Sequence, residues 1–72
     1  MSRVAAIGSW TELACYALVG VEVVDASGPE AVRRAWEELP EDVGVVLLTP
    51  EARRSLPGLL LPRELLWVVT PG

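Results

Sequence analysis

The amino-acid sequence predicts an α/β fold built on a small parallel sheet. Four short apolar runs, most of them rich in valine, alternate along the chain with segments of helical spacing. Strands that alternate with helices form parallel sheets, and nearly unbroken apolar strands are typical of sheets covered on both faces. We expect one domain over residues 1–72, because single domains cluster at about 100–150 residues.

The four apolar runs are the predicted strands. They cover Val4–Ile7, Val21–Val24, Val43–Leu48 and Leu65–Val69. The first, third and fourth are almost unbroken, which indicates strands buried on both faces. The second is interrupted by Glu22, so we expect this strand at an edge of the sheet with one side chain in water.

The segment between the first two strands predicts an amphipathic helix. Its apolar residues recur at the spacing of one helix face and are Trp10, Leu13, Ala14, Ala17 and Leu18. Ser9 and Glu12 have the spacing of a capping box, and Gly20 suits the end of a helix. We expect the apolar stripe to face the core, and Cys15, near its margin, to be a buried or half-buried structural thiol.

A second helix is predicted between the second and third strands. Ser27 and Glu30 again have the spacing of a helix start, and Pro40 ends the pattern. The predicted core-facing residues are Ala31, Val32, Ala35, Trp36 and Leu39. The opposite face is charged and is expected to be solvated.

The third helical segment is short and is followed by leucines. Thr49 suits an N-cap and Pro50 a first helical turn, but the helix can extend only to about Leu56. The segment that follows contains Leu59, Leu60 and Leu61, with Arg63 beyond them. These leucines either complete the core or form an exposed partner surface, and Leu59, Leu60, Leu61 and Arg63 are the candidate partner residues.

The element order and the handedness of the connections predict the topology. Crossovers between parallel strands are right-handed, and this places helices on both faces of the sheet. We therefore expect a four-stranded parallel sheet of order 2-1-3-4, a reduced flavodoxin-like or Rossmann-like βαβαβ(α)β arrangement.

Composition excludes several kinds of chemistry. The chain has no histidine or lysine and a single cysteine, so it offers no internal disulfide, no zinc site and no histidine or lysine catalyst. The formal net charge of −4 argues against a nucleic-acid partner. We expect no catalytic residues, no cofactor and no metal.

The distribution of apolar residues also bears on location. No apolar run approaches the roughly 18 residues of a membrane span, and the N-terminus lacks the apolar stretch of a signal peptide. We expect a cytoplasmic protein with no direct membrane insertion.

Ligands of open α/β sheets bind beyond the carboxyl ends of the strands, near the switch point. The residues there include Gly8, Ser9, Asp25, Thr49 and Thr70, without a glycine-rich phosphate loop or a Walker lysine. Nucleotide binding is therefore not expected. A small-molecule or phosphate-binding module that uses the hydroxyls of Ser9 and Thr49 remains an alternative.

The apolar motifs and their order along the chain match a known pattern. Arg3–Gly8 is a strand that ends in Ile-Gly, and Ala17–Val23 closes a helix and enters an edge strand. Val43–Thr49 reads Val-Gly-Val-Val-Leu-Leu-Thr, and Leu66–Pro71 is a final valine strand that ends at proline. This order resembles the F-subunit family of V/A-type (vacuolar/archaeal-type) rotary ATPases over nearly the whole chain, through short apolar motifs.

Three departures from that family stand out. Ser9 occupies the position of an acidic residue, and Cys15-Tyr16 replaces a Gly-Phe pair. The family continues after the fourth strand into a helical tail that reaches along the rotor shaft, whereas this sequence ends at Gly72. We therefore expect only the globular, stalk-docking role to carry over.

The resemblance implies a non-catalytic central-stalk subunit of a proton- or sodium-translocating ATPase or ATP synthase. Its partners would be other stalk subunits, above all the shaft subunit, and it would be peripheral to the membrane through that complex. Two further hypotheses remain open from the residues alone. One is the ligand-binding module described above, and the other is a self-associating scaffold that forms a homo-oligomer in isolation.

Overall fold

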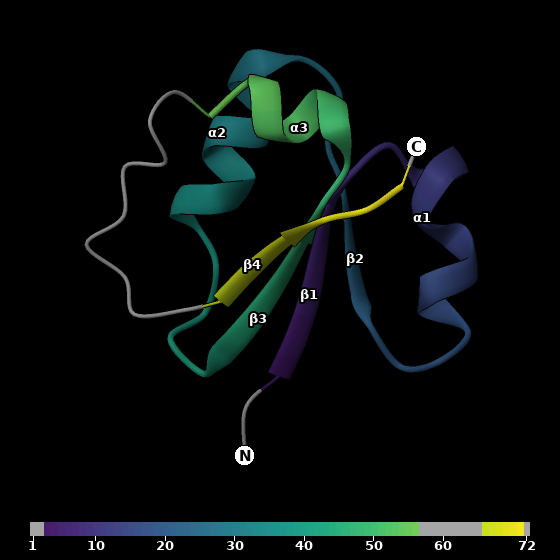
Figure 1. Cartoon of the computed structure of the whole chain (residues 1–72). Helices are drawn as coiled ribbons and strands as arrows, with labels where there is room; N and C mark the ends of the chain where they lie inside the picture. Colours follow the sequence, from purple (N-terminus) through teal and green to yellow (C-terminus); the bar gives the residue numbers. More distant parts are fainter. Residues whose placement is uncertain (1–2, 57–65, 72) are drawn as a thin grey trace.

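A computed structural model describes residues 3–56 and 66–71 of the chain. Its helices and strands follow the predicted order (Figure 1). They are β1 (Arg3–Gly8), α1 (Trp10–Ala17), β2 (Glu22–Asp25), α2 (Pro29–Glu37), β3 (Val43–Leu48), α3 (Pro50–Arg54) and β4 (Leu66–Val69). The strands form one parallel sheet of order β2-β1-β3-β4, which confirms the predicted α/β fold and its topology.

The helices lie on both sides of this sheet. The chain moves from β1 to β2 in one direction across the sheet, and then moves in the opposite direction to β3 and β4. Right-handed crossovers therefore place α1 on one side and both α2 and α3 on the other. Helix α1 packs on β1 and β2. Figure 1 shows it beside β2, the edge strand opposite β4.

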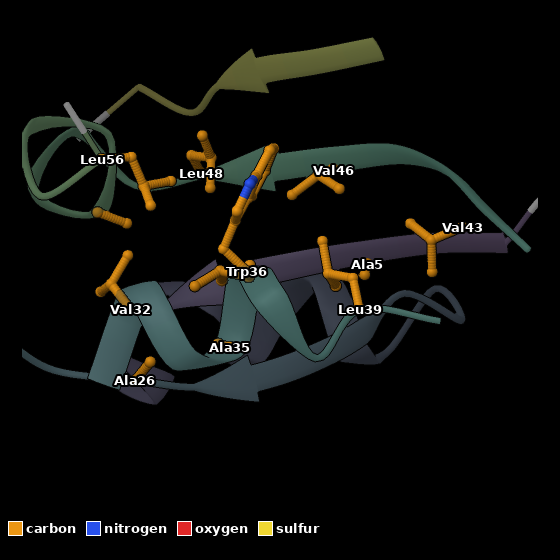
Figure 2. Close-up of a cluster of buried hydrophobic side chains, with 12 residues drawn as sticks. Ala5, Ala26, Val32, Ala35, Trp36, Leu39, Val43, Val46, Leu48 and Leu56 are labelled. Atoms are coloured by element: carbon orange, nitrogen blue, oxygen red, sulfur yellow. The ribbon is translucent and has the colours of Figure 1, made fainter. Parts of the chain in front are cut away.

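The main core lies between the sheet and the helices α2 and α3 (Figure 2). Trp36 of α2 is only 6% exposed and is the largest side chain of this cluster. The cluster consists of Ala5, Ile7, Ala26, Val32, Ala35, Trp36, Leu39, Val43, Val46, Leu48, Ala52 and Leu56, with Val24 and Trp67 packed against it. The predicted burial of Trp36 is confirmed, and Leu56, two residues beyond the end of α3, belongs to the core.

A smaller buried contact holds α1 against the other side of the sheet. Ala6 of β1 and Leu13 of α1 are both fully buried, although neither belongs to the main cluster. Ala6 points to this side because side chains alternate along a strand, and its neighbours Ala5 and Ile7 face α2.

Parts of the predicted α1 stripe are wrong. Trp10 is 50% exposed and Leu18 is also exposed. The helix has only eight residues and ends at Ala17, so Leu18 lies beyond its last turn and Trp10 at its first position. Cys15 is exposed rather than half-buried, because it lies about 200° around the helix from Leu13.

The helix starts differ from the sequence prediction at two of three positions. Ser9 forms no side-chain cap for α1; the backbone N–H of Trp10 instead donates to Oδ1 of Asp25 at 3.0 Å. Helix α2 starts after Gly28 with Pro29 in its first turn, without the predicted Ser27 cap. The Thr49 cap of α3 is confirmed, since its Oγ1 accepts from the backbone N–H of Ala52 at 3.1 Å.

Candidate interaction surface

Among the residues that the structure describes, no helix lies over the β3–β4 half of the sheet on the α1 side. Side chains alternate along each strand, and Val46, Leu48 and Trp67 all face the main core. The residues between and beside them therefore point to the α1 side. Together with their neighbour on β1 they form the uncovered sheet surface, which consists of Val4, Val45, Leu47, Leu66 and Val68.

The uncovered sheet surface is continuous and entirely apolar. In the strand register, Val4 pairs with Val45 and Val45 with Leu66, while Leu47 pairs with Val68. Leu66 is 63% exposed, Val68 44% and Val4 37%, and Val45 and Leu47 are half-buried. Strands of a parallel sheet are normally covered by helices on both faces, so this exposed apolar patch is a candidate interaction surface.

The topology explains why this half of the sheet is uncovered. Among the described helices, α1 of the β1 to β2 connection lies on this side, and it stands over those two strands. Helices α2 and α3, which follow β2 and β3 in the chain, lie on the opposite side (Figure 1). The exposure of this half of the sheet thus follows from the strand order and the handedness of the crossovers, both of which the sequence predicts.

Charge is distributed unevenly between the two sides of the sheet. Among the described residues of α1 and the strand positions that face it, the charged ones are Glu12 and Asp25, and Asp25 already accepts the hydrogen bond from Trp10. Helices α2 and α3 by contrast carry Glu30, Arg33, Arg34, Glu37, Glu51, Arg53 and Arg54. The α1 side is thus the apolar side of the molecule.

The strand ends at the switch point are closely packed. A Cβ atom at Gly8 would lie 2.4 Å from Cγ2 of Thr49, so the ends of β1 and β3 touch. Thr49 is buried and its hydroxyl is used in the α3 cap. The hydroxyl of Ser9 is within hydrogen-bond distance, 3.0 Å, of that of Thr11. The two hydroxyls that a phosphate-binding module would use are therefore engaged within the chain.

A shallow pocket of about 330 Å³ lies at the opposite end of the sheet. It is lined by Arg3, Val4, Val19, Gly20, Val21 and Glu22. Val4 also belongs to the uncovered sheet surface, and Val19 is strongly exposed. The pocket therefore adjoins the uncovered sheet surface at Val4 and reaches the turn that follows α1, and the ion-paired Arg3 and Glu22 are also part of its lining.

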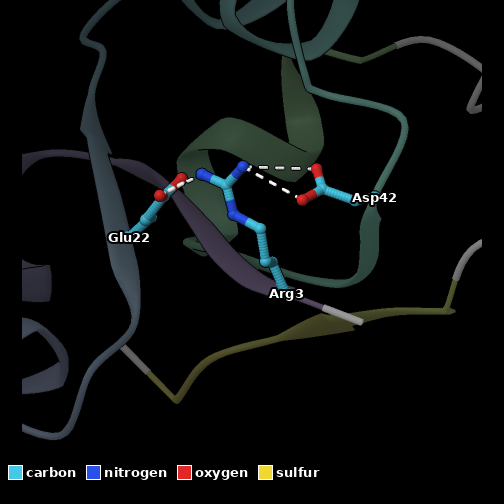
Figure 3. Close-up of polar contacts among 3 residues, drawn as sticks. All are labelled: Arg3, Glu22 and Asp42. Carbon is cyan, nitrogen blue, oxygen red and sulfur yellow. Dashed lines mark hydrogen bonds and ion pairs between the residues drawn. The ribbon is translucent and has the colours of Figure 1, made fainter. Parts of the chain in front are cut away.

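Arg3 at the rim of this pocket is held by two carboxylates (Figure 3). It forms ion pairs with Glu22 of β2 and with Asp42, which precedes β3. The hydrogen bond to Glu22 first, and then that to Asp42, raise the pKa of the Arg3 guanidinium above its ordinary value. The cluster links the starts of β1, β2 and β3. All three side chains are exposed to solvent, so it stabilises the fold only weakly. Glu22 is exposed at the sheet edge, as predicted.

The described part of the chain contains no group of three histidine, cysteine, aspartate or glutamate residues suited to hold a metal ion. Within the same residues, no helix has both the length and the apolar character required to cross a bilayer. The candidate partner residues Leu59, Leu60, Leu61 and Arg63 lie outside the described residues. The uncovered sheet surface was not predicted from the sequence.

Comparisons with known proteins give no relative for this chain. No protein-family model, no curated protein and no solved structure matches it.

Proposed function

We propose that this chain is a non-catalytic docking domain, and that the assembly it serves is the central stalk of a V/A-type rotary ATPase. The observation that carries the docking role is the uncovered sheet surface, because apolar sheet positions beside a helix-covered half are expected to meet another protein. The resemblance of Arg3–Gly8 and Val43–Thr49 to the motifs of the F-subunit family supports the particular assembly.

A stalk subunit transmits torque by packing and needs no catalytic group of its own. The absence of histidine and lysine from the sequence agrees with such a role. Its partners would be the shaft subunit and other stalk subunits, and it would meet the cytoplasmic face of the membrane only through the complex. The hydroxyls of Ser9 and Thr49 are engaged within the chain, so we do not propose the phosphate-binding alternative.

The experiment is a binding titration with the shaft subunit of the V/A-type ATPase from the same organism. Val68→Glu places a carboxylate on the uncovered sheet surface, and Val69→Glu places one on the other side of the same strand. Val69 is a matched control because it is 38% exposed, close to the 44% of Val68. We expect Val68→Glu to weaken binding about ten-fold or more, or at least 1.4 kcal/mol, and Val69→Glu to leave it nearly unchanged.

Two results would contradict this proposal in different ways. If the wild-type chain does not bind the shaft subunit, the assignment to the rotary ATPase stalk is wrong. If it binds and both variants bind equally well, the stalk assignment holds but the docking surface is elsewhere. Circular dichroism of both variants establishes that they remain folded.

A further inference from the structure

We propose that the uncovered sheet surface seats a single partner helix whose apolar stripe is flanked by basic residues. The inference deepens the proposed docking function by naming the chemistry of the partner, and it rests on that function. Three features carry it: the width of the surface, its apolar character and the carboxylate of Glu12 beside it.

The width of the surface matches one helix. Strands lie about 4.8 Å apart, so β3 and β4 together with their flanks offer about 10 Å, which is the diameter of an α-helix with its side chains. Helix α1 fills the same width over β1 and β2 on this side. A partner helix over β3 and β4 would complete the layer that α1 begins.

The exposed side chains fit the apolar stripe of such a helix. Val4, Val45 and Leu66 form one row across the strands, and Leu47 and Val68 form the next. A helix that crosses these rows meets them with residues at i, i+3, i+4 and i+7, the spacing of an amphipathic stripe. No described charged residue occupies these rows, so the stripe itself would be uncharged.

Helix α1 presents Glu12 and Tyr16 toward the seat of this helix. Leu13 points at the sheet and is fully buried, and successive residues are rotated by about 100°. Because α1 runs against the strand direction after a right-handed crossover, the flank that precedes Leu13 faces β3. Glu12 and Tyr16 both lie on that flank, at about −100° and −60° from Leu13.

The charge of Glu12 selects the partner. Glu12 is exposed and forms no ion pair with any residue that the structure describes. A basic residue at the edge of the partner stripe would meet it, and the net charge of −4 favours a basic helix at longer range. A second copy of the chain that docked through this same face would instead bring a second Glu12, because α1 carries no basic residue.

The test uses two stapled helical peptides of about 14 residues, or about 21 Å, which matches the length of β3. They share the same leucine stripe and differ only at the flanking positions, which are arginine in one and glutamate in the other. Binding of each peptide to the full chain is measured by fluorescence anisotropy of a dye on the peptide. We expect the arginine peptide to bind about ten-fold or more tightly than the glutamate peptide.

Variants of the chain test whether the peptides bind on the uncovered sheet surface beside Glu12. Glu12→Arg should reverse the preference between the two peptides, and Glu12→Gln should reduce it. Val68→Glu should abolish binding of both peptides, whereas Val69→Glu on the other side of β4 should not. Circular dichroism of each variant verifies the fold, and Leu66→Glu provides a second surface variant if Val68→Glu does not fold.

Several outcomes would overturn this proposal. One is a preference for the arginine peptide that survives Glu12→Arg, since the preference would then come from the overall charge. Another is peptide binding that Val68→Glu and Leu66→Glu leave intact. A third is a homodimer that Val68→Glu dissociates while neither peptide binds, which would assign the surface to a second copy. None of these results depends on whether the shaft subunit binds, so failure here is distinguishable from failure of the stalk assignment.

Discussion

Gly8 and Thr49 meet at the carboxyl ends of the two central strands with no room for an additional atom. A Cβ at Gly8 would lie 2.4 Å from Cγ2 and 2.6 Å from Oγ1 of Thr49. The same Oγ1 accepts the hydrogen bond that caps α3. Thr49 therefore both closes the switch point of the sheet through its contact with Gly8 and caps the start of α3 through its hydroxyl.

The first prediction follows from this contact. Gly8→Ala should destabilise the fold by about 1–3 kcal/mol, because the added methyl group overpacks the site. The φ of +155° at this residue adds strain for any side chain. Urea unfolding followed by circular dichroism measures the change.

A double-mutant cycle gives this prediction its control. Thr49→Ala alone should destabilise by about 0.5–2 kcal/mol through loss of the cap. It also removes Cγ2 and Oγ1, the two atoms that the new methyl group would strike. The double variant should therefore be destabilised by less than the sum of the two single destabilisations. Additive effects would show that the two residues do not press on each other.

The second prediction contrasts two tryptophans. Trp36→Ala should destabilise by about 3–5 kcal/mol, as large-to-small changes in a core do, and against a total of about 5–15 kcal/mol the variant should be largely unfolded. Trp10→Ala should have a much smaller effect, because half of this side chain is already in water. Thermal unfolding of the two variants compares them, and equal losses would be inconsistent with the packing described.

The third prediction concerns the start of α1. Asp25→Ala should destabilise by about 0.5–2 kcal/mol, because its carboxylate accepts the hydrogen bond from the backbone N–H of Trp10. Ser9→Ala should change stability less, since the Ser9 hydroxyl caps no backbone group of this helix. Chemical denaturation of the two variants distinguishes them, and a larger effect of Ser9→Ala would restore the capping box predicted from the sequence.

The fold could be predicted from the sequence because its signals are regional. Valine-rich strands, alternation with helices and crossover handedness each summarise many residues, and the strand order follows from them. The strong amphipathic pattern of α2 correctly indicated that Trp36 is buried.

The features that the sequence predicted wrongly, the cap of α1 and the burial of Trp10 and Leu18, are set by local details of the folded structure. Asp25 is far from Trp10 in sequence, so its role at the helix start required the register between β1 and β2. Trp10 and Leu18 fit the apolar stripe of α1, but the helix is too short to bury its ends. Three consecutive leucines at Leu59–Leu61 stand out in the sequence and were therefore predicted as a partner surface. The uncovered sheet surface consists of ordinary strand residues from β1, β3 and β4, which have no distinguishing sequence pattern. The partner surface at Leu59–Leu61 stays a prediction.

The most direct test of the central claim is methyl NMR of the chain labelled at valine and leucine, titrated with the shaft subunit. We expect binding to shift the methyl signals of Val4, Leu66 and Val68. Signals of Val32 and Val46, buried on the other side of the sheet, should remain in place. Shifts confined to Val69, to the residues of α2 or to Leu59–Leu61, with Val4, Leu66 and Val68 unchanged, would contradict it.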